Sequence, residues 1–71
     1  MPYVNIKITR EGATPGQKAQ LIAGTTRLLA EVLGKDPATT FVVIDEVELE
    51  NWGIAGLPVP EFREQKAQRK V

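Results

Sequence analysis

A helix pattern with both of its ends marked occupies the middle of the chain, over about residues 15 to 33. Thr14, Pro15 and Gln17 predict its start, because they supply a side-chain acceptor, a first helical residue and the second half of a capping box. Gly34 predicts its end, where a left-handed C-terminal cap belongs. Gly24 costs up to about 1 kcal/mol relative to alanine, and it indicates either close packing against a sheet or a tolerated defect. A chain of 71 residues that contains this helix is long enough for one small domain and no more.

Strand patterns do lie on both sides of this helix. Residues 2 to 9 alternate with period two, with Val4, Ile6 and Ile8 on the apolar face. Residues 40 to 47 contain the continuous apolar run from Phe41 to Ile44, as expected for a strand covered on both faces. Strand, helix and strand in so short a chain predict a right-handed βαβ unit with two parallel strands, an α+β fold.

The last third of the chain is short of structural signals. Residues 52 to 56 are apolar and rich in glycine, which predicts either a short hairpin or a strand added to a neighbour's sheet. Pro58 and Pro60 limit further strand pairing. Residues 61 to 71 are strongly charged, and we expect a frayed helix or a disordered end there. The length predicts a single domain over residues 1 to 71.

The small size of the chain favours association. A domain of about 60 residues buries only about 60% of the surface that its unfolded chain exposes. The chain has no cysteine and no histidine, which removes disulfides and imidazole metal sites as sources of stability. One face of the predicted sheet takes the helix, whereas Tyr3 and Phe41 have nothing in the chain to cover them. We therefore expect a homo-oligomer that packs sheet to sheet or around an axis.

Composition excludes several classes of function. The net charge is zero, with nine basic and nine acidic residues, so no nucleic-acid footprint is expected. No secretory signal and no apolar run of about 20 residues is present, so we expect no membrane segment and a cytoplasmic location by default. The absence of serine, cysteine and histidine rules out the Ser-His and Cys-His triads. The remaining acid–base candidates are carboxylates, lysines, Tyr3 and the terminal amine. The acidic run at residues 45 to 50 indicates a solvated strand end, and no metal site is expected.

Several short stretches together resemble the 4-oxalocrotonate tautomerase family. They are residues 2–8, 11–12, 17–18, 21–22, 42–44, 46, 51–54 and 56. The resemblance implies a βαβ chain assembled as a hexamer, a trimer of dimers, that uses neither a metal nor an organic cofactor. It also implies that removal of Met1 exposes the secondary amine of Pro2 as a general base. That base would transfer a proton between the enol and keto forms of a small unsaturated 2-hydroxy or 2-oxo acid.

The same resemblance implies two arginines that bind substrate and one aromatic residue that closes the pocket. Trp52 matches the aromatic position, but Ala13 and Phe41 stand where the arginines belong. Arg10, in a first loop that is about one residue longer, either reaches the space left at Ala13 or lies on the solvated surface. Arg63 is a remote candidate that we do not assign to the site. We therefore expect a substrate with one carboxylate, or one with an apolar group that packs on Phe41 and Trp52.

Two other functions stay open at this point. One is hydration or dehalogenation of a small unsaturated acid, which needs a water-activating carboxylate beside Pro2 together with arginines. The other is a non-catalytic oligomeric module that keeps the fold for binding, and the missing arginines are its main support. The state of Met1 bears on the choice, because the nitrogen of Pro2 is an amide for as long as Met1 is attached.

Overall fold

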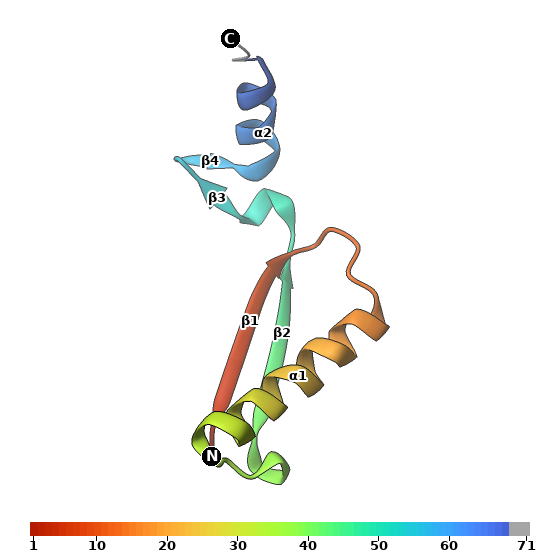
Figure 1. The fold of residues 1–71 in the computed structure, drawn as a ribbon. Coiled ribbons are helices and arrows are strands. Elements are labelled where there is room, and N and C mark those ends of the chain that lie inside the picture. The colour runs from red at the N-terminus through yellow and green to blue at the C-terminus, as the bar shows by residue number, and fades with distance from the viewer. Residues whose placement is uncertain (69–71) are drawn as a thin grey trace.

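The computed structural model describes residues 1 to 68 and has the predicted strand–helix–strand order (Figure 1). Its elements are β1 (Tyr3–Thr9), α1 (Pro15–Leu33), η1 (Pro37–Thr39), β2 (Phe41–Val47), η2 (Leu49–Asn51), β3 (Gly53–Ile54), β4 (Leu57–Pro58) and α2 (Val59–Gln68). Strands β1 and β2 pair in parallel, from Tyr3 opposite Phe41 to Thr9 opposite Val47. The βαβ prediction is therefore confirmed.

Helix α1 begins and ends where the sequence predicts, and local hydrogen bonds explain why. The Thr14 hydroxyl accepts from the Gln17 amide at 3.1 Å, and the Gln17 side-chain oxygen accepts from the Thr14 amide at 2.9 Å. At the other end Gly34 adopts φ 66° and ψ 25°, and its amide donates to the Ala30 carbonyl at 3.0 Å. Both ends thus pair backbone groups that a helix leaves unsatisfied.

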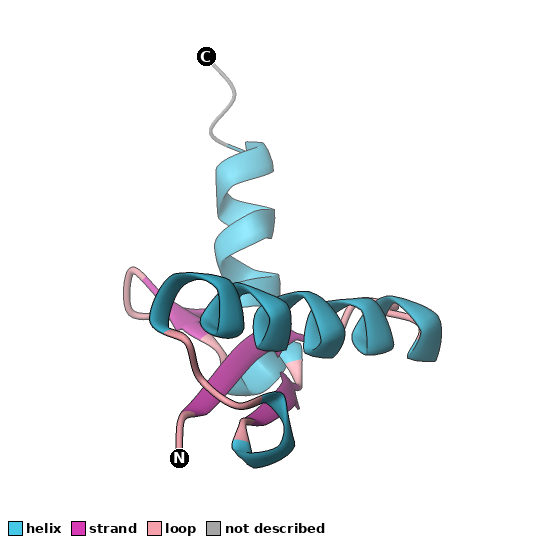
Figure 2. Ribbon diagram, turned by 60° about the horizontal axis from the view of Figure 1, so that its bottom comes forward, coloured by secondary structure: helices cyan, strands magenta, loops and turns pink. Residues whose placement is uncertain are grey.

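Helix α1 covers one face of the two-stranded sheet and leaves the other face bare (Figures 1 and 2). Lys18 on the helix reaches Glu46 of β2, which places Glu46 on the covered face. The opposite face carries Tyr3, Phe41 and Val43, all of them exposed. This agrees with the expectation that nothing in the chain covers Tyr3 and Phe41. Coverage of β2 on both faces needs a second copy, because the one long helix covers only one face.

The C-terminal third folds as a hairpin followed by a helix. Strands β3 and β4 are antiparallel, with Ile54 opposite Leu57, and the turn between them uses positive φ angles at Ala55 and Gly56. The hairpin alternative is therefore the one observed. Helix α2 covers residues 61 to 68 of the charged tail, so the helical alternative holds there and the disordered one does not. The rest of the tail, residues 69 to 71, lies outside the described residues.

The single chain has almost no interior of its own. Among the described residues Val59 is the only buried apolar one, with 6% of its surface exposed. The radius of gyration is 16.6 Å, whereas a compact chain of this length would have roughly 11 Å. The accessible surface is 5456 Å², against about 4,400 Å² for a typical folded monomer of this mass. The excess surface supports the expectation that copies of the chain associate.

Candidate active site

Pro2 and Phe41 lie together at the N-terminal end of the sheet. The Phe41 amide donates to the Pro2 carbonyl at 3.0 Å, so the ladder between β1 and β2 fixes the two residues next to each other. Pro2 is half-buried, while 64% of Tyr3 and 51% of Phe41 are exposed. Pro2 therefore lies at the end of a sheet that carries two exposed aromatic side chains on one face.

Met1 stands directly before this aromatic patch and is 84% exposed. Its peptide bond makes the Pro2 nitrogen a tertiary amide, which has no basic lone pair because the pair is delocalised into the carbonyl. Hydrolysis of that one bond would convert the nitrogen into a secondary amine. The exposure of Met1 leaves the bond accessible from solvent.

Trp52 lies beyond the opposite end of the sheet. It follows η2, and its carbonyl accepts from the Val59 amide at 2.9 Å, which ties the base of the hairpin to the start of α2. Trp52 lines a cleft of about 370 Å³ at this end. The other lining residues come from β1, the hairpin and α2: Thr9, Ile54, Val59, Phe62, Arg63 and Lys66.

The predicted site residues are thus divided between two distant places. Pro2 precedes β1 and Thr9 ends it, and seven residues of strand span about 23 Å. A single chain brings Pro2 to Phe41 but does not bring Pro2 to Trp52. A pocket that contains both Pro2 and Trp52 therefore needs a second copy of the chain.

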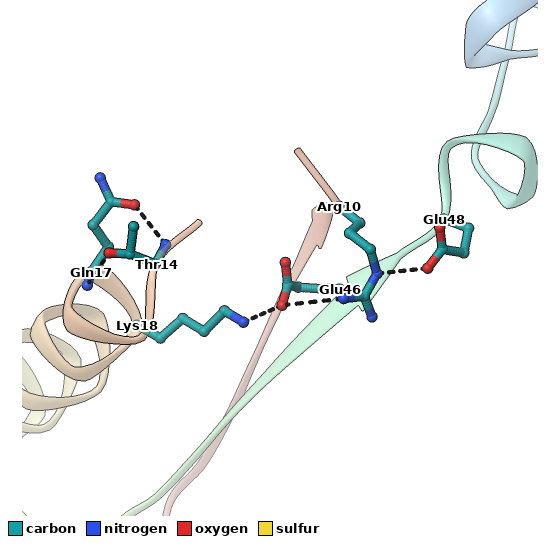
Figure 3. A network of polar contacts seen from close by, with 6 residues as sticks. All are labelled: Arg10, Thr14, Gln17, Lys18, Glu46 and Glu48. Atoms are coloured by element: carbon teal, nitrogen blue, oxygen red, sulfur yellow. Dashed lines mark hydrogen bonds and ion pairs between the residues drawn. The ribbon is translucent and has the colours of Figure 1, made fainter. Parts of the chain in front are cut away.

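Arg10 is engaged by two carboxylates (Figure 3). Its Nε lies 2.6 Å from Glu48 Oε1, and its Nη1 lies 3.9 Å from Glu46 Oε1. Glu46 also accepts from Lys18, and this hydrogen bond holds the pKa of the Glu46 carboxyl below its usual range. In the single chain Arg10 therefore lies on the surface, paired with these two carboxylates.

Arg63 is, with Lys66, one of two cations that the structure places in the Trp52 cleft. Its Nη1 donates to Glu11 Oε1 at 2.8 Å, and this contact lowers the pKa of the Glu11 carboxyl. Sequence reasoning left Arg63 unassigned and missed Lys66 altogether. The signal was the spacing i, i+3, i+4, i+7 of Val59, Phe62, Arg63 and Lys66, which puts all four on one helical face.

Three of the acidic residues after Ile44, namely Asp45, Glu46 and Glu48, pair with cations. Asp45 accepts from Lys7 at 2.9 Å and from Asn5 at 3.0 Å, and these bonds lower the pKa of its carboxyl. Within residues 1 to 68 no group of three or more acidic, histidine or cysteine side chains is arranged to hold a metal ion. Over the same residues, neither helix combines the length and the apolar character needed to cross a bilayer.

Known proteins resemble this chain over most of its length. A probable tautomerase, K2, of Dickeya dadantii is 63% identical over 92% of this chain and 97% of its own length. A 2-hydroxymuconate tautomerase of Comamonas testosteroni is 41% identical over 87% of this chain and 97% of its own.

Solved structures share the fold. The crystal structure of DmpI from Helicobacter pylori superposes with a TM-score of 0.82, at 43% identity, over 89% of this chain and 97% of that one. A heterohexamer 4-oxalocrotonate tautomerase of Chloroflexus aurantiacus gives a TM-score of 0.78 at 27% identity, over 89% of this chain and 100% of that one. The family model described as tautomerase enzyme matches residues 2 to 61. The chain therefore belongs to the tautomerase family.

Proposed function

We propose that this tautomerase acts on a small unsaturated 2-hydroxy or 2-oxo acid, with the N-terminal amine of Pro2 as its general base. The observation that carries the proposal is the place of Pro2, which is half-buried at the end of a sheet whose bare face, with Tyr3 and Phe41, a second copy would cover. Removing an amine from water disfavours its charged form and lowers its pKa. A base with a pKa near the working pH is the most effective proton carrier.

The reaction needs only the substrate and this amine. The neutral amine of Pro2 takes the proton of the enol hydroxyl. The oxygen then forms the carbonyl double bond, and the electrons of the C=C bond move to the carbon that will be protonated. The protonated amine then returns the proton to that carbon. The same amine removes and returns the proton, so the proposed step includes neither a metal nor an organic cofactor.

The proposed catalyst is an oligomer, and we propose a homohexamer built as a trimer of dimers. The bare face with Tyr3 and Phe41 supports association, as does the separation of Pro2 from Trp52 within one chain. The Chloroflexus relative is a heterohexamer. In this arrangement Phe41 and Trp52 would supply the apolar walls that pack against the substrate, one from each of two copies.

The test starts with the mass of the purified chain, which reports whether Met1 has been removed. Ketonisation of phenylenolpyruvate and of 2-hydroxymuconate is then followed by absorbance in the processed wild type, in Pro2→Ala and in the control Pro60→Ala. We expect Pro2→Ala to lower kcat/KM by about a hundredfold, the low end of what acid–base catalysis contributes. Pro60→Ala should retain activity.

Other outcomes identify the alternatives. Full activity in Pro2→Ala would refute Pro2 as the base. Absence of ketonisation in a processed wild type would favour the binding module. Release of chloride from 3-chloroacrylate, without ketonisation, would favour the dehalogenase alternative.

A further inference from the structure

Helix α2 presents one mixed face to the Trp52 cleft. Val59, Phe62, Arg63 and Lys66 recur at helical spacing, and all four line the cleft. The apolar pair lies nearer the start of the helix, where Val59 is tied to the Trp52 carbonyl. The basic pair follows one turn further on. The cleft therefore combines an apolar wall with cationic side chains, which suits an organic anion with an apolar body.

The cleft carries a net charge of one positive unit, which one anionic group would balance. Arg63 and Lys66 contribute two positive charges, and Glu11 offsets one of them through its 2.8 Å contact with Arg63 Nη1. A guanidinium has five N–H donors, so one bond to Glu11 leaves donors for a second carboxylate. Within residues 1 to 68 Lys66 makes no ion pair or side-chain hydrogen bond. Both cations are exposed enough to reach a ligand.

We propose that Arg63 and Lys66 bind the carboxylate of the substrate against Trp52, and that the Glu11 charge favours substrates with one carboxylate over those with two. The proposal rests on the proposed function, in which a second copy brings its Pro2 to this cleft. Arg63 and Lys66 lie after residue 61, where the match to the family model ends. They supply positive charge from a different element in a chain that has Ala13 and Phe41 in place of arginines.

A binding experiment tests this assignment without catalysis. Trp52 is the only tryptophan, so its fluorescence reports occupancy of the cleft. The probes are 3-phenylpropanoate, which has one carboxylate, and the uncharged 3-phenylpropanamide. We expect Arg63→Gln to weaken binding of the acid about tenfold, the loss typical of one charge-assisted hydrogen bond, and to leave the amide unchanged. Arg27→Gln, on α1, is the matched control and should bind both probes as the wild type does.

Further variants separate a direct contact from an indirect one. Arg63→Lys should keep most of the affinity, and Lys66→Gln should weaken the acid as well. The double variant Glu11→Gln with Arg63→Gln should remain weak, because the missing cation rather than an exposed Glu11 causes the loss. Recovery of acid binding in that double variant, or unchanged binding in Arg63→Gln, would overturn the proposal. Circular dichroism confirms that each variant keeps its helices.

Kinetics distinguish this proposal from the one on which it rests. Arg63→Gln should raise KM for phenylenolpyruvate about tenfold with little change in kcat, since the contact is made equally before and during proton transfer. Glu11→Gln should lower KM for 2-hydroxymuconate relative to phenylenolpyruvate. Pro2→Ala should lose turnover but bind 3-phenylpropanoate normally. Wild-type turnover in Pro2→Ala refutes the base, whereas Pro2-dependent turnover with an unchanged KM in Arg63→Gln refutes only the carboxylate site.

Discussion

Phe41→Asp should break the assembly of this protein. Phe41 lies on the bare face of the sheet with 51% of its surface exposed in the single chain. An aromatic side chain has about 200 Å² to bury, so about 100 Å² remains for a second copy to cover. At about 25 cal/mol per Å², that area is worth about 2.5 kcal/mol for each copy. If a two-fold axis pairs the faces, each dimer contact loses about 5 kcal/mol, or several thousandfold in the dissociation constant.

The assay is sedimentation of the wild type and of Phe41→Asp at micromolar concentration. The control is Gln20→Asp, which adds the same charge at an exposed position of α1. We expect the wild type and the control to sediment as oligomers and Phe41→Asp to sediment as a smaller species. Its activity should fall too, because one chain separates Pro2 from Trp52. An unchanged mass for Phe41→Asp, or a monomeric wild type, would refute the reasoning.

Two further predictions concern stability. Gly24→Ala should stabilise the protein by up to about 1 kcal/mol, seen as a rise in Tm of about 4–8 °C, because an added Cβ meets no atom within 4 Å in the chain; a lower Tm would mean that a second copy packs closely against Gly24. The pKa of Glu46 is lowered, first by the hydrogen bond from Lys18, so this group contributes stability that is present above the usual glutamate pKa of 4.5 and is lost as the pH falls through the folded-state pKa. Below pH 4.5 the Tm should therefore fall by less in Glu46→Gln than in the wild type. Identical pH dependence of the Tm in both would contradict this role.

The parts of the fold that depend on local hydrogen bonds were predictable from the sequence. Thr14, Gln17 and Gly34 determine the ends of α1 through contacts within a few residues, so their pattern alone was sufficient. The parallel pairing of β1 and β2 followed from the length of the connection and from its handedness. The coverage of β2 was predictable only in part, because a single helix can cover one face, whereas a continuous apolar run does not show what covers the other.

The C-terminal helix was harder to predict for a different reason. Charged residues dominate the tail and obscure the four-residue face of α2 that begins at Val59. That face is short, and it has a cleft to line only after β3 and β4 have turned the chain back. Its cations could therefore be assigned to the site only once the hairpin had been placed.

The positions of the candidate site residues were predictable in part. Parallel strands place Pro2 beside Phe41, and Trp52, which follows β2, at the opposite end. The partner of Arg10 was not predictable, because Glu48 and Glu46 compete for it at 2.6 and 3.9 Å only after β1 and β2 pair. An arginine held in this way must leave Glu48 before it can reach a substrate.

On the proposed function, assembly and basicity are linked at Pro2. An amine in an active site can be made less basic by a nearby cation or by removal from water. A second copy would bring the cations of its Trp52 cleft, Arg63 and Lys66, toward Pro2, and it would also remove Pro2 from water. The bare face provides that only when a second copy covers Tyr3 and Phe41. Dissociation should therefore raise the pKa of the Pro2 amine as well as separate it from Trp52, and Phe41→Asp would lose activity by both routes.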